Sequence, residues 1–286
     1  MIVISAASGR LGQAAITELV KHVSAANIRL AARAPAKLDT WKSRGAEVVH
    51  ADYDDSASLE AAFAGAEALF LISSEGPNEV RIRHHKNAID AAGRAGVQHI
   101  LYTSFVNPTT ESRFTWAIPH AETEPYLKAC GIPYTILRDN QYAANLGGFI
   151  SQAKETGVFA LPGAKGKVAY VTHKDIAAVA AAVLTQRGHE GKTYELTGPE
   201  ALDGFEIAAI ISQATGREIK ATDPALEEAA AHFRAMGLPE FAVEGLVSMY
   251  AAAEAGEYAM VTQDVEMLAG RPAESVRTYI VEAVSG

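Results

Sequence analysis

The chain has 286 residues, a length that allows one large domain or two interlocked ones. Its 49% apolar and 21% charged residues are ordinary for a globular protein. A net charge of −9 disfavours nucleic acid as a partner, because an acidic surface repels phosphate backbones. The single cysteine, Cys130, excludes an internal disulfide, and the longest apolar run, 176–184, is too short to span a bilayer. We therefore expect a cytoplasmic protein that binds neither nucleic acid nor membrane.

Short apolar runs alternate with helical patterns through the first two thirds of the chain. The expected strands are residues 2–5, 28–33, 46–53, 68–73, 99–104, 133–138 and 193–198. Several are apolar almost throughout, which is typical of parallel strands covered on both faces. Between the first two, residues 11–23 carry apolar side chains at the i, i+4 spacing of one buried helical stripe.

Capping residues mark the later helices. Ser56 is expected to cap a helix that ends at Gly65, and Gly96 to end the helix over 80–96. Thr172 and Asp175 form a T-x-x-D capping pattern before the run at 176–184. The final third has helical patterns at 205–216, 225–237 and 239–256 with few strands between them.

This order of elements predicts an α/β fold, a doubly wound parallel sheet of the Rossmann type. The sheet domain is expected over residues 1–138, completed by 168–200. Residues 139–167 and 201–286 are expected to form a smaller, mainly helical substrate lobe.

The segment SAASGRLG, residues 5–12, lies between the first expected strand and the first expected helix. Gly9 and Gly12 fit the second and third glycines of G-x-x-G-x-x-G, whereas Ala6 replaces the first. Such a loop lets backbone N–H groups approach a pyrophosphate at a helix N-terminus. Alanine is expected to fit the turn only with a negative φ. An ordinary βα turn is the alternative, which the strand–loop–helix context disfavours.

Basic residues rather than an acid follow the second expected strand. Arg33 ends that strand, Lys37 lies one turn later, and Arg10 lies in the glycine loop. An acid at this place bonds the ribose of NAD, whereas an arginine accommodates the 2′-phosphate of NADP. The pattern predicts NADP(H); the alternative is that Arg33 and Lys37 are merely solvated. Asp52 is expected either at the adenine edge or as a loop cap.

The segments SAASGRLG, LAARAPAK, HADYDD, LFLISS, HILYTS, HAETE and IPYTILRDNQY occur in order. In sequence and spacing they resemble the NmrA-like atypical short-chain dehydrogenases/reductases, over nearly the whole chain. The resemblance implies that residues 72–74 follow the ribose and pyrophosphate and that 137–142 lie beside the nicotinamide. Asp139 stands where the family usually has Asn. Together with the loop analysis, the predicted cofactor contacts are Ala6, Ala7, Ser8, Gly9, Arg10, Leu11, Gly12, Arg33, Lys37, Asp52, Tyr53, Ile72, Ser73, Ser74, Thr103, Arg138, Asp139, Asn140 and Gln141.

Typical short-chain dehydrogenases use a Y-x-x-x-K pair, which Tyr102, Tyr126 and Tyr134 do not form. At the corresponding place stand His120 and Glu124, as in family members that reduce quinones and dyes. We therefore expect hydride transfer from NADPH to a flat, electron-poor aromatic acceptor (a quinone, azo or triphenylmethane dye) without flavin. The candidate catalytic residues are His120, Ser104 and Tyr142.

Each candidate has a structural alternative. His120 is otherwise a surface histidine at a helix start; Glu124 could orient it, although Pro125 is expected to disturb their helix. Ser104 is otherwise a cap or loop hydroxyl. The pair His84–His85 is interpreted as a helix face, without a metal site.

Aromatic side chains are expected to line the acceptor site. The predicted substrate contacts are Phe105, Trp116, Asn140, Tyr142 and Phe149, with Phe114 nearby; plain packing is the alternative for each aromatic residue.

Two other functions stay open at this point. One is a non-catalytic NADP(H)-sensing regulatory protein of the NmrA type, which also needs no Y-x-x-x-K pair. The other is an isoflavone- or pinoresinol-type reductase, which depends on a lysine; Lys128 is near the right region but at an unconvincing spacing. The expected partner is a small aromatic acceptor, and association as a homodimer is left open.

Overall fold

The computed structural model describes residues 1–285, which fall into two compact units. Unit 1 comprises Met1–Phe105, Pro119–Arg138 and His173–Tyr194. Unit 2 comprises Val106–Ile118, Asp139–Thr172 and the described residues from Glu195 onward. This division differs from the expected one, which assigned 106–118, 168–172 and 195–200 to the sheet domain. The 3₁₀ turn Thr115–Ala117, within 106–118, contacts a helix of unit 2.

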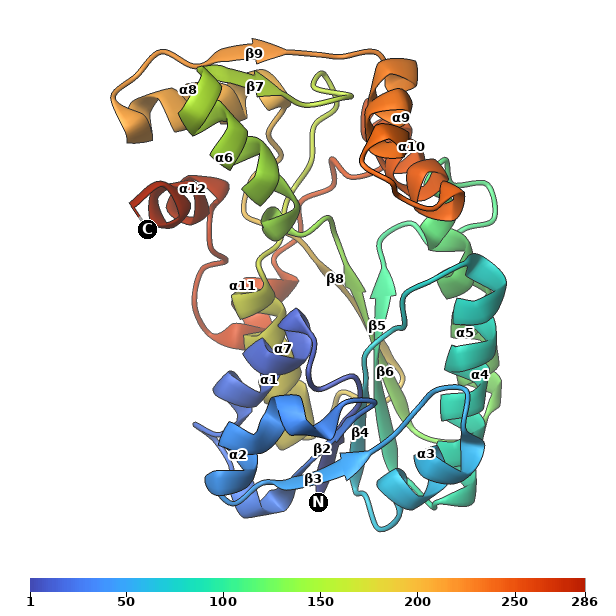
Figure 1. The fold of residues 1–286 in the computed structure, drawn as a ribbon. Helices are drawn as coiled ribbons and strands as arrows, with labels where there is room; N and C mark the ends of the chain where they lie inside the picture. The colour runs from blue at the N-terminus through green and yellow to red at the C-terminus, as the bar shows by residue number, and fades with distance from the viewer. Residues whose placement is uncertain (286) are drawn as a thin grey trace. The chain divides into compact units, whose positions relative to one another are not determined.

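In the described part of the chain a seven-stranded sheet runs in the order β3-β2-β1-β4-β5-β6-β8 (Figure 1). β1 pairs in parallel with β2 and β4, as β2 does with β3 and β4 with β5. The seven predicted strands are confirmed, and the fold is the predicted Rossmann-like α/β fold. The strand bounds are β1 Ile2–Ile4, β2 Ile28–Ala32, β3 Glu47–His50, β4 Ala68–Leu71, β5 His99–Phe105, β6 Tyr134–Asp139 and β8 Lys192–Leu196.

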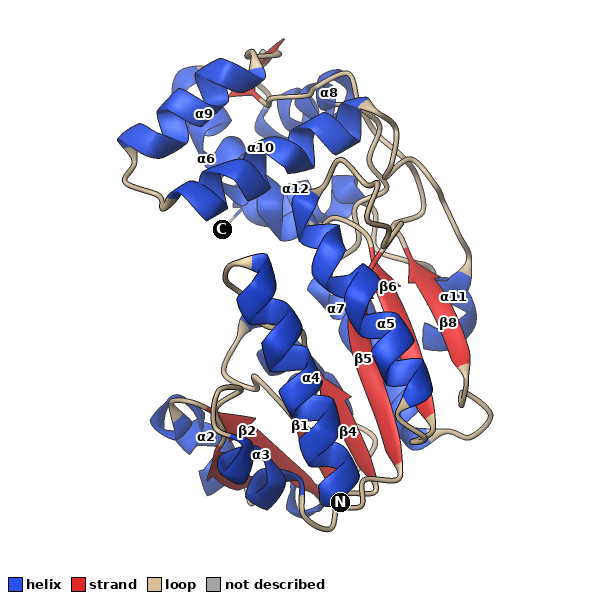
Figure 2. Ribbon diagram, turned by 90° about the vertical axis from the view of Figure 1, so that its right-hand side faces the viewer, coloured by secondary structure: helices blue, strands red, loops and turns tan. Residues whose placement is uncertain are grey.

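Helices cover both faces of this sheet (Figure 2). One face carries α3 (Ser56–Phe63), α4 (Asn78–Arg94) and α5 (Ile118–Ala129), and α3 contacts α4. The other carries α1 (Arg10–Leu19) and α7 (His173–Thr185), which contact each other. The short α2 (Asp39–Ser43) follows β2. Phe63, Ile89, Tyr102 and Ile136 are among the side chains of the core between the sheet and α3–α5.

Two local expectations for these helices are wrong. The cap of α3 is Asp55 rather than Ser56, since the Asp55 carboxylate accepts hydrogen bonds from the N–H groups of Ala57 and Ser58. Pro125 does not interrupt α5, which continues to Ala129. Gly65 and Gly96 adopt the positive φ that the predicted helix ends require.

Unit 2 is mainly helical, as predicted. In it, α6 (Gly147–Thr156), α8 (Gly204–Thr215) and α12 (Val276–Ser285) contact one another, and α9 (Leu226–Ala235) contacts α10 (Glu240–Glu254). The sequence did not predict the parallel pair β7 (Val158–Ala160) and β9 (Lys220–Thr222), because three-residue strands are too short to show alternation. The remaining elements are α11 (Asp264–Ala269) and the 3₁₀ turns Ala25–Asn27, Pro35–Leu38, Thr115–Ala117 and Ala143–Leu146.

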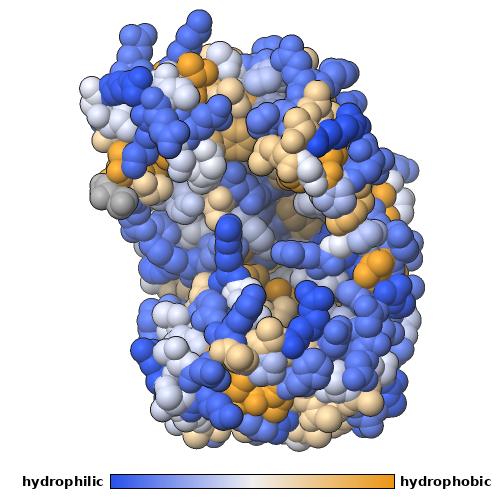
Figure 3. All heavy atoms as spheres, in the orientation of Figure 1, coloured by the Kyte–Doolittle hydropathy of each residue, from blue (hydrophilic) through white to orange (hydrophobic). Residues whose placement is uncertain are grey.

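Polar side chains dominate the face shown in Figure 3, and apolar residues form small separate groups on it. Among residues 1–285, no helix combines the length and the apolar character needed to cross a bilayer.

Candidate functional site

The loop after β1 brings backbone N–H groups to the start of α1. Gly9 is the N-cap of α1, and within the described residues no side chain caps it. A Cβ on Gly12 would lie 2.7 Å from the carbonyl oxygen of Ala7 and 2.8 Å from that of Ala6, so only glycine fits at this position. The loop and the helix therefore pack closely and leave the first N–H groups of α1 for an anion.

Ala6 adopts φ +47, so the expectation of a negative φ is wrong. This left-handed conformation brings the Ala6 carbonyl to the N–H of Gly9 at 2.9 Å and closes the turn. For a residue with a Cβ the conformation costs about 1–2 kcal/mol. The first glycine of the motif is thus replaced at a position whose backbone still adopts a glycine-like conformation.

Three cations of unit 1 are exposed near this loop or after β2. Arg10 is the first residue of α1, Arg33 follows β2 directly, and Lys37 lies on the 3₁₀ turn Pro35–Leu38. None of them forms an ion pair with a described residue. They remain predicted ligands of a 2′-phosphate. Asp52 accepts a hydrogen bond from the Asp54 N–H at 3.1 Å, which favours its loop-cap alternative.

The segment after β4, residues 72–74, lies beside β1 and β5, at the point where the strand order of the sheet reverses. The Ser5 hydroxyl accepts from the N–H of Ile72 at 3.0 Å and donates to the carbonyl of Phe70. The Tyr53 hydroxyl lies 2.7 Å from the Ser5 hydroxyl and 2.6 Å from the carbonyl of Ile72. Tyr53, a predicted cofactor contact, thus links the loop after β1 to the segment after β4.

The same segment is held further along by β5 and α4. Thr103 Oγ1 accepts from the N–H of Ser73 at 2.8 Å. The N–H of Ser74 donates to His85 Nε2 at 3.1 Å, and Arg81 Nε donates to the Ser74 carbonyl at 2.8 Å. Sequence reasoning missed Arg81 and set His85 aside as part of a helix face, although both side chains are buried.

His120 lies in the interior of unit 1, so its interpretation as a surface histidine is wrong. Its side chain is 4% exposed, with Nε2 3.0 Å from Arg81 Nη2 and Nδ1 2.8 Å from the Tyr102 hydroxyl. Burial, followed by the positive charge of Arg81, lowers the pKa of His120 well below its usual value. A neutral ring with both nitrogens bonded to protein is poorly suited to giving up a proton.

Glu124 does not orient His120 in the way considered above. It accepts from the Ser104 hydroxyl at 2.8 Å and from Arg138 Nε and Nη2 at 2.8 and 2.7 Å. Burial opposes its ionisation, but the bonds and charge of Arg138 lower its pKa overall. The Lys128 ammonium lies 3.3 Å from the same carboxylate, so this lysine belongs to an ion-pair cluster.

The part of the predicted nicotinamide segment that lies in unit 2 begins at Asp139, whose carboxyl group is fully buried. The Tyr142 hydroxyl lies 3.1 Å from Asp139 Oδ2, while Asp139 Oδ1 has no partner among the described residues. Burial raises the pKa of Asp139 well above its usual value, and the Tyr142 bond offsets this only in part. Asn140 Nδ2 donates to the carbonyl of Tyr258, and Asn140 Oδ1 accepts from the Gln141 N–H.

Two predicted acceptor contacts take part in packing within unit 2. A Cβ on Gly245 would lie 2.1 Å from the Trp116 ring, so Trp116 packs directly on α10. Phe149 makes edge contacts with the rings of Phe159 and Tyr250. Both Trp116 and Phe149 are half-buried, as is Phe105 in unit 1.

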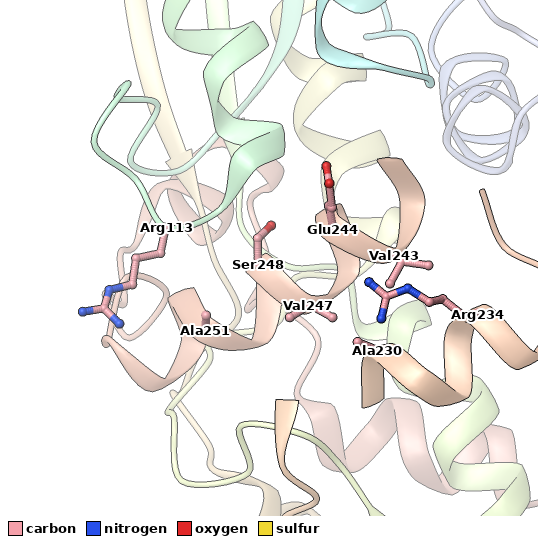
Figure 4. A pocket seen from close by; sticks show the side chains of 8 residues that line it. All are labelled: Arg113, Ala230, Arg234, Val243, Glu244, Val247, Ser248 and Ala251. Carbon is pink, nitrogen blue, oxygen red and sulfur yellow. The ribbon is translucent and has the colours of Figure 1, made fainter. Parts of the chain in front are cut away.

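A pocket of about 560 Å³ lies within unit 2, and the sequence did not predict it. Figure 4 shows residues of α9 and α10 around it, with Arg113 from the segment before the 3₁₀ turn. It brings four apolar side chains together with three charged side chains and a serine hydroxyl. The lining residues are Ala230, Val243, Val247, Ala251, Arg113, Arg234, Glu244 and Ser248.

Tyr170 and Lys174, a pair that the sequence analysis does not include, have the Y-x-x-x-K spacing. Tyr170 precedes α7 and lies in the segment where Val171 bridges to Tyr142, outside any helix. The i, i+4 spacing brings side chains together only on a helix. Tyr170 is also buried, which raises its pKa. The pattern therefore does not form the proton-donating pair of typical short-chain dehydrogenases.

Comparison with known proteins places these features in context. Residues 1–276 match the model of the NmrA-like family. Quinone oxidoreductase 2 of Escherichia coli is 37% identical over 285 residues, covering 100% of this chain and 98% of that protein. The NAD(P)H azoreductase of Xenophilus azovorans is 30% identical over 281 residues, covering 98% and 96%.

Solved structures agree. The NADPH complex of the E. coli quinone oxidoreductase superposes with a TM-score of 0.92 at 36% identity, covering 100% of this chain and 99% of that one. The NADP(H) complex of Citrobacter sp. triphenylmethane reductase has a TM-score of 0.93 at 33% identity, covering 99% and 100%.

Proposed function

The chain belongs to the NmrA-like family, and we propose that it is an NADPH-dependent oxidoreductase that reduces a flat, electron-poor aromatic acceptor without flavin. The observation that carries this proposal is the glycine loop at the start of α1, together with the exposed cations Arg10, Arg33 and Lys37. The full-length similarity to quinone, azo-dye and triphenylmethane-dye reductases supports it and favours an enzyme over a non-catalytic sensor.

The residues of unit 1 fit the phosphates of NADP(H). The close packing of the loop on Gly12, which a Cβ would prevent, and the N-terminus of α1 without a side-chain cap suit a pyrophosphate. Arg33 and Lys37, which lie after β2, suit a 2′-phosphate. When bound, the cofactor supplies a hydride from C4 of the nicotinamide.

The residues of unit 2 suit a different part of the reaction. A quinone that has accepted a hydride becomes an anion and needs one proton. We favour Tyr142 with Asp139 as the proton source over His120, because the half-buried Tyr142 hydroxyl contacts the Asp139 carboxyl, whose raised pKa favours its protonated form. Ser104 remains a predicted catalytic residue, with its proton directed at Glu124.

A panel assay tests the proposal. Purified protein is mixed with NADPH and, in turn, a benzoquinone, an azo dye and a cationic triphenylmethane dye, and NADPH absorbance is followed. The proposal expects NADPH oxidation with at least one acceptor and none without acceptor. Tight NADPH binding with no turnover on any acceptor, together with a stable protein partner in a pull-down, would instead support the regulatory alternative.

A further inference from the structure

Two side chains of α4 hold both backbone polar groups of Ser74. Arg81 Nε donates to the Ser74 carbonyl at 2.8 Å, and the Ser74 N–H donates to His85 Nε2 at 3.1 Å. Arg81 and His85 lie one turn apart on the helix and are 7% and 0% exposed. Two buried side chains that bond both the N–H and the carbonyl of one loop residue fix the position of that loop.

The hydrogen-bond partners also fix the protonation of His85. An amide N–H can only donate, so His85 Nε2 accepts and the ring proton is on Nδ1. Nδ1 lies 2.9 Å from Thr123 Oγ1, whose own hydroxyl donates to the carbonyl of Pro119. Burial, then the charge of Arg81, lowers the pKa of His85 well below its usual value. The ring is therefore held neutral and in one orientation.

His120 and Tyr102 are hydrogen-bonded to Arg81 and His85 and form a buried cluster with them. Arg81 Nη2 donates to His120 Nε2, so the His120 proton is also on Nδ1, facing the Tyr102 hydroxyl. The same hydroxyl lies 3.2 Å from His85 Nδ1. Arg81, His85, Tyr102 and His120 thus form a continuous buried cluster, in which each member constrains the next.

Residues 72–74 have every N–H bonded to a side chain. Ile72 donates to Ser5 Oγ, Ser73 to Thr103 Oγ1, and Ser74 to His85. These bonds replace the strand ladder, because β4 ends at Leu71. The segment consequently has no backbone donor to offer a phosphate, and the carbonyls of Ile72 and Ser74 already accept from Tyr53 and Arg81. The Ser74 hydroxyl has no partner among the described residues, and a serine hydroxyl suits the hydroxyl groups of a ribose.

We propose that Arg81 and His85 are positioning residues, which hold the segment after β4 in the conformation that binds the sugar of the cofactor. This inference rests on the proposed function, since it takes NADP(H) to be the ligand. It gives Tyr102 and His120 a supporting role, because they keep Arg81 and His85 in place.

The test compares His85→Phe with His85→Gln. Phenylalanine keeps an aromatic ring, although a larger one, but leaves the Ser74 N–H without an acceptor, whereas the glutamine carbonyl oxygen can accept at that place. His99→Phe is the matched control, because His99 is a part-buried histidine of unit 1 that lies at the start of β5 and bonds Thr135 instead. The readouts are the Kd for NADPH by fluorescence titration, amide exchange at Ser74 by NMR, and Tm.

His85→Phe is expected to raise the NADPH Kd about tenfold and to accelerate Ser74 exchange by a similar factor. His85→Gln should restore both to within about threefold of wild type. His99→Phe should lower Tm without changing either. If His85→Phe does not fold, Arg81→Lys, which loses the second donor but keeps the charge, should show the same two changes.

Unchanged Ser74 exchange in His85→Phe would overturn the inference, and so would an equal loss of NADPH affinity in His99→Phe. Failure of the proposed function looks different. In that case the wild-type protein would either not bind NADPH or bind it without reducing any acceptor, while Ser74 exchange would still report whether His85 holds the loop.

Discussion

The buried cluster of unit 1 and the buried carboxyl group of Asp139 in unit 2 differ in how fully their polar atoms are hydrogen-bonded. In unit 1, His85 and His120 have each ring nitrogen within hydrogen-bond distance of a protein group. In unit 2, Asp139 is just as buried, yet one of its oxygens has no partner among the described residues. A cluster whose polar atoms are all hydrogen-bonded holds a fixed shape. A buried carboxyl group with an unbonded oxygen lowers the stability of the fold, and protonation or substitution of that group removes this cost.

This difference predicts opposite pH dependences. The folded-state pKa values of both histidines lie below the ordinary 6.5, so their contribution to stability is complete above that pH and is lost as the pH falls below it. The folded-state pKa of Asp139 lies above the ordinary 3.8, so its contribution is complete below that pH and is lost as the pH rises through the folded-state pKa. Falling pH therefore weakens unit 1 through these two histidines, and rising pH weakens unit 2 through Asp139.

The largest expected effect is that of Gly12→Ala, which alters the glycine loop of unit 1. Gly12→Ala places a methyl group against the carbonyls of Ala6 and Ala7, at a cost of about 3 kcal/mol in NADPH binding or in folding. Fluorescence titration and urea unfolding would measure it. Gly93→Ala is the control, because its Cβ would meet nothing closer than 3.9 Å and should stabilise α4. Normal NADPH affinity together with unchanged stability in Gly12→Ala would contradict the loop assignment.

Arg33→Ala should weaken NADPH binding about 10- to 100-fold, through loss of a charge-assisted contact with the 2′-phosphate, and should change NADH binding little. Lys37→Ala should show a smaller loss of the same kind. The comparison is made by titration with both cofactors, with the exposed Arg187→Ala as the control. Equal losses for NADPH and NADH would exclude Arg33 as the 2′-phosphate ligand.

Tyr142→Phe tests whether the Tyr142 hydroxyl of unit 2 supplies the proton. Quinone reduction requires a proton, so kcat for a quinone should fall about tenfold or more. Reduction of a cationic triphenylmethane dye forms a carbon–hydrogen bond and requires no proton, so its kcat should stay within about twofold. The Kd for NADPH should not change. A parallel loss with both acceptors would show that Tyr142 positions substrate instead.

Asp139→Asn tests the buried carboxyl directly. The amide cannot ionise, so the variant should be about 1–2 kcal/mol more stable than wild type at pH 8, and this gain should disappear toward pH 4. Urea unfolding across that range measures it, with the exposed Asp39→Asn as the control. A gain that is independent of pH would refute the raised pKa of Asp139.

The smallest expected effect is that of Ala6→Gly. Because Ala6 has φ +47, glycine should relieve strain and stabilise the folded state by about 0.5–1 kcal/mol. Thermal unfolding measures the gain. A loss of stability would mean that the entropy cost of glycine in the unfolded chain exceeds the strain at this turn.

The fold was largely predictable from the sequence, because most strands of the sheet are apolar runs that alternate with helical patterns. The loop at residues 5–12 was predictable for the same reason, since its spacing is fixed by local backbone geometry. The buried cluster that bonds Ser74 was not predicted, because its members come from α4, β5 and α5, which are separate in the sequence. These members are Arg81, His85, Tyr102 and His120. Arg81 and His85 did leave one trace: they lie on the same helical stripe as Ala88 and Ala92, where buried polar side chains call for partners. The pocket on α9 and α10 depends on packing between helices, which local spacing does not encode.

The most direct test of the proposed function is to follow the hydride itself. NADPH carrying deuterium at C4, labelled separately on each face, is incubated with the purified, flavin-free protein and a cationic triphenylmethane dye. The colourless product is then analysed by mass spectrometry. The proposal predicts that one deuterium per dye molecule appears on the central carbon, from one face of the cofactor only. A reduced dye without deuterium from either face, or no reduction of any acceptor despite NADPH binding, would contradict it.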